Sequence, residues 1–237
     1  MTADVRRAAE RPTTQISWLD SKHSFSFGRH YDLANTSFGL LLVNNDDVVA
    51  PGSGFSTHPH RDMEIITWVL DGELVHQDSH GHNGLIVPGL AQRMSAGTGM
   101  LHSEMNATAA SPVHFVQMWV VPDTESVPPS YQQLDISAEL QRGGLVPVAS
   151  GRGHEAAIAI RQEGAVLWAA RLAEGESVQL PDAAYVHVFL AVGAADLEGA
   201  GRLSEGDAVR LTSAGGPRLT AVGGRTEILV WEMRQQV

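Results

Sequence analysis

Two short pairs of metal-binding side chains stand out in this sequence. His58 and His60 flank a proline, and His102 and Glu104 repeat the same spacing of two residues. In a β-strand, residues two apart face the same side at about 6.6–6.8 Å, so both pairs can point at one ion. Three imidazoles and one carboxylate leave coordination positions open, which is typical of a catalytic metal site. The pattern predicts one divalent ion held by these four side chains.

The composition restricts which metals and partners the chain can bind. The 237 residues include no cysteine, which excludes thiolate metal sites, iron–sulfur clusters, disulfides and a cysteine nucleophile. Imidazole ligands with one carboxylate suit Fe(II), Mn, Co, Ni, Cu or Zn. A formal charge of −11 argues against direct binding of nucleic acid. No apolar run is long enough for a membrane span and the N-terminus lacks a signal-peptide pattern, so we expect a cytoplasmic protein with no membrane partner.

Most of the chain reads as short strands separated by Gly, Pro, Asn and Asp. The clearest predicted strands are Phe38–Val43, Glu64–Leu70, Leu85–Val87, Val113–Val121, Val166–Leu172, Tyr185–Val192 and Glu227–Met233. Only Tyr131–Arg142 has a spacing compatible with a helix, and it ends at Gly143 and Gly144. This pattern predicts an all-β protein with short helices near a domain junction at the two glycines.

A weak internal repeat indicates two similar halves. Four residues recur 117 positions later, so that Gly84, Gly89, Ala91 and Arg93 correspond to Gly201, Gly206, Ala208 and Arg210. The same offset places His58–His60 on Gly175–Ser177, and His102 and Glu104 on Leu219 and Ala221. We therefore expect a metal-binding N-terminal domain at residues 1–135 and a C-terminal domain without metal ligands at residues 145–237.

Two motifs and three longer segments of the sequence resemble a known family. Gly52, His58–His60 and Glu64 match the first cupin motif, and Gly89, Ser95–Gly97, His102 and Asn106 are similar to the second. The segments Trp18–Phe27, His58–Glu64 and His102–Met105 resemble the pirin family of bicupins. The resemblance implies two tandem cupin barrels, each a double-stranded β-helix or jelly roll, with one metal ion in the first barrel and lost ligands in the second.

The resemblance also implies two functional hypotheses. Bacterial pirin-like proteins are similar to quercetin 2,3-dioxygenases, which implies a metal ion, with Fe(II) in first place, a flavonol-like aromatic substrate and O2. In that reaction the flavonol binds the metal through its 3-hydroxyl, loses a proton and reacts with O2, so that the central ring opens and carbon monoxide is released. The alternative is a metal- or redox-sensing regulatory protein that binds a transcription factor or a metabolic enzyme, as the similarity to eukaryotic pirins implies.

The identity of the fourth ligand differs between the two patterns. The general cupin motif assigns this role to Glu64, whereas pirins use the glutamate two residues after the third histidine, which is Glu104 here. Along a strand Glu64 lies about 13 Å from His60, while Glu104 is next to His102 on its face. We therefore predict that Glu104 is a ligand and the catalytic proton acceptor, and that Glu64 has a supporting or structural role.

The remaining aromatic and histidine residues receive simpler interpretations. A solvated hairpin turn is expected around His76, His80 and His82, and His187 is expected to be a hydrogen-bonded core or edge residue. Core packing is expected for Trp18, Phe25 and Phe27. We expect an apolar substrate pocket above the metal, with Phe55, Met63, Trp68 and Met118 as candidate wall residues.

Overall fold

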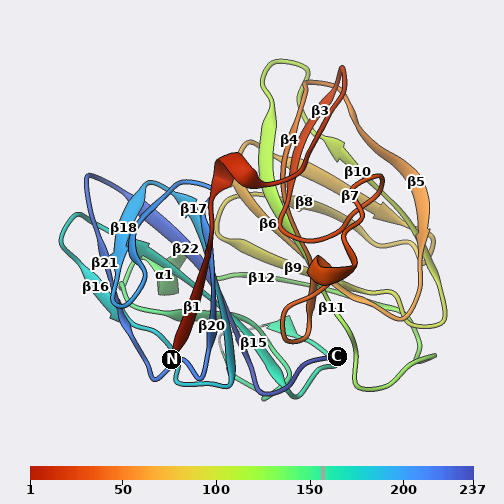
Figure 1. Ribbon diagram of the computed structural model, residues 1–237. Helices are drawn as coiled ribbons and strands as arrows, with labels where there is room; N and C mark the ends of the chain where they lie inside the picture. The colour runs from red at the N-terminus through yellow and green to blue at the C-terminus, as the bar shows by residue number, and fades with distance from the viewer. Residues whose placement is uncertain (156–157) are drawn as a thin grey trace.

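The computed structural model describes residues 1–155 and 158–237, and almost all of its regular secondary structure is β-strand (Figure 1). The first barrel has a seven-stranded sheet in the order β12-β9-β6-β11-β4-β3-β2 and a four-stranded sheet in the order β5-β10-β7-β8. The seven strands are Ser130–Asp135, Leu90–Ser95, Glu64–Asp71, Val113–Val120, Leu41–Val49, Leu19–His23 and Thr13–Gln15. The four strands are Gly54–His60, Met100–Asn106, Leu74–Asp78 and Asn83–Ile86.

The second barrel has the same strand order as the first, although its outermost pair of strands, β13 and β14, is parallel rather than antiparallel. Its larger sheet has the order β1-β20-β17-β22-β15-β13-β14, and its smaller sheet has the order β16-β21-β18-β19. The larger sheet contains Thr2–Arg6, Ala208–Thr212, Tyr185–Val192, Thr226–Met233, Ala165–Leu172, Val146–Ser150 and Ile158–Ala159. The smaller sheet contains Ser177–Gln179, Arg218–Ala221, Ala194–Leu197 and Gly201–Ser204. The predicted all-β fold with two cupin-type barrels is confirmed.

Short helices are found where the chain changes direction. The α-helix α1 (Ser137–Leu140) follows β12 near the junction, and two 3₁₀ helices span Ala8–Glu10 and Leu33–Asn35. Within the described residues, no helix is both long and apolar enough to cross a membrane.

The predicted helix at Tyr131–Arg142 is largely wrong. Its first half is strand β12, in which Ser130 to Asp135 pair with Ser95 to Leu90 of β9. Pairing satisfies the backbone groups along the open edge of β9, and this tertiary contact outweighs the local helical spacing. The carboxylate of Asp135 accepts a hydrogen bond from the Ser137 backbone N–H at 2.9 Å, which marks the start of the short helix α1.

The chain start crosses to the other barrel. Strand β1 pairs with β20 of the second barrel, and Figure 1 shows it beside the strands of that barrel rather than those that follow it in sequence. Strand β12 occupies the equivalent edge of the first barrel. The division into residues 1–135 and 145–237 remains a prediction, and residues 2–6 pack with the second part.

The internal repeat corresponds to equivalent strands, since β8 and β9 match β19 and β20 in the two sheet orders. Gly89 and Gly206 both have positive φ, 95° and 82°, a left-handed conformation that glycine adopts without strain. The offset of 117 positions does not hold for the strand equivalent to β5, however. His102 pairs with His58, whereas its counterpart Leu219 pairs with Val178 rather than Gly175.

The interior of the second barrel is apolar at the positions equivalent to the predicted ligands. Val178, Leu180, Leu219 and Ala221 are buried in one hydrophobic cluster. Leu219 follows its partner Val178 by 41 residues (219 − 178), whereas His102 follows His58 by 44 (102 − 58), so the repeat offset misplaces β16 by three positions. Polar ligand side chains are thus replaced by core packing.

A second hydrophobic cluster joins the two barrels and corrects part of the expected pocket wall. Trp68 and Met118 are fully buried in it with Leu167, Leu229 and Trp231 of the second barrel. Strands β6 and β11 are buried on both faces, so their alternate residues point toward the second barrel and away from the first barrel's interior.

His187 departs from its interpretation as a hydrogen-bonded residue. It is fully buried on β17, and neither ring nitrogen has a hydrogen-bond partner among the described residues. Burial, together with the charges of Arg210 and Arg11, lowers the pKa of His187 to about 3. The ring is therefore neutral at physiological pH, and it lies 5.8 Å from the ring of Phe25.

Candidate metal centre

Strands β5 and β10 bring three of the predicted ligands together. They are antiparallel neighbours, and His102 lies directly opposite His58. The ring centroids of His58, His60 and His102 are 4.5–4.9 Å apart. One ring nitrogen from each of the three lies within 4.8 Å of the other two. The alternation of side chains along a strand explains why the His-x-His spacing achieves this convergence.

The nitrogen atoms of these histidines are available to a metal ion. The Nε2 atoms of His60 and His102 are buried and have no hydrogen-bond partner among the described residues. Nδ1 of His58 donates to the Ser56 carbonyl oxygen at 2.8 Å, which leaves its Nε2 unprotonated in the neutral ring. Burial and the neighbouring histidines lower the pKa of His60 to about 4 and that of His102 to about 3. Neutral imidazoles with bare, unpaired nitrogens are the donor set that a divalent ion requires.

Glu104 lies next to this group, on the far side of a register shift. The β5–β10 pairing shifts between His102 and Glu104, so Glu104 pairs with Phe55. Its carboxylate oxygen lies within 4.8 Å of the ring nitrogens of His76 and His102, and these three residues form a second buried group. The two groups share His102. The structure therefore gathers three predicted ligands closely and places the fourth beside them.

The carboxylate of Glu104 is held by two hydrogen bonds. The Thr67 hydroxyl donates to Oε1 at 3.0 Å, and the Gln117 side-chain amide donates to Oε2. Trp119 Nε1 donates to Gln117 Oε1 at 3.1 Å, which orients the amide so that its NH2 group faces Glu104. Sequence reasoning did not identify Thr67 or Gln117, because each has an apolar residue on either side within its strand.

Glu64 is in neither of these groups. It is buried, and its carboxylate accepts hydrogen bonds from the Ser95 hydroxyl at 2.8 Å and from the Arg161 backbone N–H at 3.2 Å. Arg161 belongs to the C-terminal half of the chain. These contacts connect Glu64 to residues from both halves of the chain.

His76 was misassigned to a solvated turn. His80 is exposed at the hairpin, but His76 is fully buried on β7, opposite Glu104 of β10. Strand alternation explains the difference, because His76 points inward from the strand while His80 lies in the turn itself. The two-residue spacing of His76 and Asp78, which repeats that of the His-x-His pair, was the signal that could have identified it.

A chain of hydrogen bonds through His76 sets the proton positions on His102. His76 Nε2 lies 3.3 Å from an Asp78 carboxylate oxygen, and His76 Nδ1 lies 3.4 Å from His102 Nδ1. The carboxylate only accepts, so neutral His76 carries its proton on Nε2 and accepts at Nδ1 from His102. His102 then presents an unprotonated Nε2. Such outer contacts fix the tautomer and orientation of metal-binding histidines.

Replacing His76 with leucine should therefore weaken metal binding about 10- to 100-fold, because His102 loses the acceptor that fixes its tautomer. Competition against a chromogenic chelator measures this affinity. The matched control is His80→Ala in the exposed turn, which should bind as the wild type does. An unchanged affinity in folded His76→Leu protein would contradict the assigned hydrogen-bond chain.

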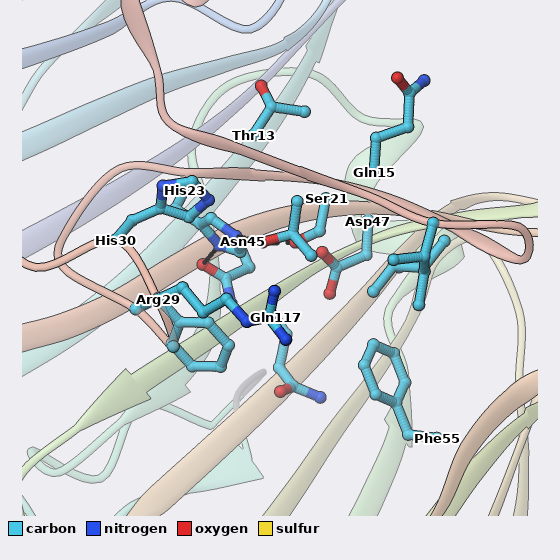
Figure 2. Close-up of a pocket in the computed structure, with 15 residues that line it drawn as sticks. Thr13, Gln15, Ser21, His23, Arg29, His30, Asn45, Asp47, Phe55 and Gln117 are labelled. Carbon is cyan, nitrogen blue, oxygen red and sulfur yellow. Dashed lines mark hydrogen bonds between the residues drawn. The ribbon is translucent and has the colours of Figure 1, made fainter.

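A cavity of about 500 Å³ lies close to the histidine group, although none of the four predicted ligands lines it. Phe55 and Gln117 connect the cavity wall to these ligands. Figure 2 shows residues from β2, β3, β4 and β11 around it, with Arg29 and His30 from the loop after β3. Phe55 lines the cavity with its ring centroid 6.4 Å from that of His58, and Gln117 links the cavity wall to Glu104.

The cavity wall is more polar than expected. Of the four candidate wall residues only Phe55 lines the cavity, while Met63 packs beside a separate cluster near Trp119. Phe27, expected in the core, also lines it. The polar lining side chains include His23, Asn45, Asp47 and Gln117. These polar residues occupy inward positions of β3, β4 and β11, where sequence alternation alone predicts core packing.

Comparison with known proteins relates both halves of the chain to described families. The family model described as Pirin matches residues 4–120, and the model described as Quercetinase C-terminal cupin domain matches residues 147–233. A Mycobacterium bovis protein provisionally named quercetin 2,3-dioxygenase is 58% identical over 237 residues, which cover 100% of this chain and 97% of that protein.

Two Escherichia coli proteins add to this picture. The quercetin 2,3-dioxygenase of strain K12 is 46% identical over 129 residues, which are 54% of this chain and 56% of that enzyme. The crystal structure of the bacterial pirin YhhW in complex with nickel(II) superposes with a TM-score of 0.90 at 32% identity and covers 100% of both chains.

Proposed function

Because the chain belongs to the pirin family of two-barrel cupin proteins, we propose that it is a metal-dependent dioxygenase acting on flavonols such as quercetin. It opens the central ring with O2 and releases carbon monoxide. The observation that carries this proposal is the convergence of three histidines with unpaired nitrogens beside a cavity of about 500 Å³. Such a site suits a chelating aromatic substrate and a small gas.

We propose that His58, His60, His102 and Glu104 hold one divalent ion in the first barrel. Fe(II) is the ion that the family resemblance implies, and the nickel(II) complex of the E. coli pirin supports a related site that accepts divalent ions. A bound ion supplies Lewis acidity, which lowers the pKa of a flavonol 3-hydroxyl group.

Glu104 is the proton acceptor in this proposal. Its carboxylate is fixed between the Thr67 hydroxyl and the Gln117 amide, at the boundary between the histidine group and the cavity. A base held in position by two donors needs no reorganisation when the hydroxyl proton is transferred. Gln117 also lines the cavity, so the residue that donates a hydrogen bond to Glu104 is itself in contact with the space for the substrate.

The cavity provides the surfaces that hold a flat aromatic molecule. Phe27 and Phe55 line it, and Trp119 packs edge to face against both Phe27 and His60, with ring centroids 5.7 and 4.8 Å away. Aromatic side chains bury a planar ligand while excluding water from the reacting atoms.

Glutamine substitutions at the two buried glutamates test this assignment. We expect Glu104→Gln to lose quercetin turnover by about 10²–10⁴-fold and to bind the metal more weakly, because the amide cannot accept a proton. Glu64→Gln is the matched control, since it removes a buried carboxylate that contacts Ser95 and Arg161 instead. Aerobic loss of quercetin and metal content are measured on both variants. The opposite ranking would show that Glu64 is the ligand, and absence of turnover by metal-loaded wild type would refute the proposed activity.

A further inference from the structure

Asp47 is a buried acid in the wall of the cavity. It lies on β4, its exposed fraction is 2%, and it faces the space that also contains Phe55 and Gln117 (Figure 2). Its Oδ1 atom has no hydrogen-bond partner among the described residues. Buried carboxylates are normally paired, because an unpaired one loses its hydration without compensation.

Two neighbours of Asp47 on the same strand, Asn45 and Asp46, have paired side-chain oxygens. Asn45 Oδ1 accepts from His23 Nδ1 at 2.8 Å, and Asp46, on the opposite face, contacts both Arg11 and His114. Asp47 instead lies between Ser21 of β3 and Phe115 of β11. Burial raises its pKa to about 7, with smaller contributions from the charges of Asp46 and Glu104. A hydrogen bond from the Ser21 side chain opposes this shift, so the atom without a partner is Oδ1 alone.

The Asp47 carboxyl group lies at a cavity rather than in a closed core, so a bound ligand can supply the missing hydrogen bond. A hydrogen-bond donor that enters the cavity would satisfy the carboxyl oxygen and restore the interaction lost on burial. Arg29 also lines the cavity. Because this arginine supplies a positive charge that can balance Asp47, the ligand need not be a cation. A neutral donor such as a phenolic hydroxyl fits both the charge and the aromatic lining.

We propose that Asp47 accepts a hydrogen bond from a hydroxyl group of the bound aromatic molecule, so that the site selects polyhydroxylated flavonols over unsubstituted ones. The inference rests on the proposed function and deepens it, because it assigns substrate selectivity to a residue outside the histidine group. Sites that are built to pair with a substrate hydroxyl reject analogues that lack it, since the polar group of the protein is then left unpaired.

The test is equilibrium binding of two probes under anaerobic conditions, so that no turnover is required. Quercetin and 3-hydroxyflavone, which share the 3-hydroxyl and differ in the remaining hydroxyls, are titrated into metal-loaded protein by fluorescence. We expect the wild type to prefer quercetin by about 10- to 100-fold. Asp47→Ala should reduce this preference to about threefold or less while 3-hydroxyflavone binds as before. Asp20→Ala, on the other face of β3, is the control that keeps the preference.

A melting-temperature measurement at pH 8 separates recognition from a structural role. Removing a buried carboxyl group that has one unpaired oxygen and no ion pair should not lower the melting temperature of Asp47→Ala. A lower melting temperature with an unchanged preference for quercetin would overturn the proposal and make Asp47 structural. If wild type cleaves quercetin but Asp47→Ala keeps the preference, this inference fails and the proposed function stands. If wild type shows the Asp47-dependent preference without cleaving quercetin, the proposed function fails and the recognition role stands.

Discussion

Replacing His102 with alanine is expected to abolish metal binding and quercetin turnover together. His102 is the residue shared by both groups of candidate metal ligands, and its buried Nε2 has no partner among the described residues. Losing the ion removes several kcal/mol of charge stabilisation from the reaction, which corresponds to a fall of about a thousandfold or more in turnover. Metal content by elemental analysis and aerobic loss of quercetin measure the two effects on the same sample.

The control for this variant is His187→Ala. It removes another buried histidine, from β17 of the second barrel and outside both metal-binding groups. This protein should keep its metal and its turnover if it folds, as checked by circular dichroism. Wild-type turnover by metal-free His102→Ala protein would contradict the proposed role of the histidine group.

The second large effect is expected on stability, from Trp68→Ala. Trp68 is fully buried in the cluster between the barrels, and its Nε1 donates to a Glu227 carboxylate oxygen at 2.8 Å. Truncation leaves a cavity and removes one of the donors to a buried carboxylate. The free energy of unfolding should fall by about 3–5 kcal/mol, as for other buried aromatic residues. Urea denaturation followed by circular dichroism measures the loss.

Trp68→Phe separates the two contributions to this effect. Phenylalanine keeps most of the buried apolar surface but cannot donate to Glu227, which retains its ion pairs with Arg171 and Arg225. We expect a smaller destabilisation of about 1–3 kcal/mol. A loss below about 1 kcal/mol for Trp68→Ala would show that the barrels do not depend on this cluster.

Strand periodicity was sufficient to predict the all-β fold, and the two-residue spacing predicted the histidine group, whereas the two cupin barrels were implied by the family resemblance. The predicted strand at Glu64–Leu70 is β6, and the positions of His58, His60 and His102 on β5 and β10 make their side chains converge. These features depend on local alternation, which a sequence displays directly. The repeat was also visible because turn glycines such as Gly89 and Gly206 need a left-handed backbone in both copies.

Features that depend on long-range pairing were not predictable in the same way. Ser130–Asp135 forms a strand because β9 has an open edge beside it. Trp68 faces the second barrel because β6 is covered on both faces, and a continuously apolar strand does not reveal which residues face which neighbour. His76 was missed because its buried partners, His102 and Glu104, are contributed by another strand.

The measurement that tests the central claim most directly is carbon monoxide release by the metal-loaded protein in the presence of quercetin and O2. The ring-opening reaction predicts one carbon monoxide per quercetin consumed, with none from protein stripped of metal by a chelator and recovery after reloading with a divalent ion. Loading with Fe, Mn, Co, Ni and Cu in turn covers the metals that these ligands accept. Carbon monoxide that rises in step with quercetin loss only in loaded samples is the predicted result. Loaded protein that leaves quercetin intact with every metal would contradict the account.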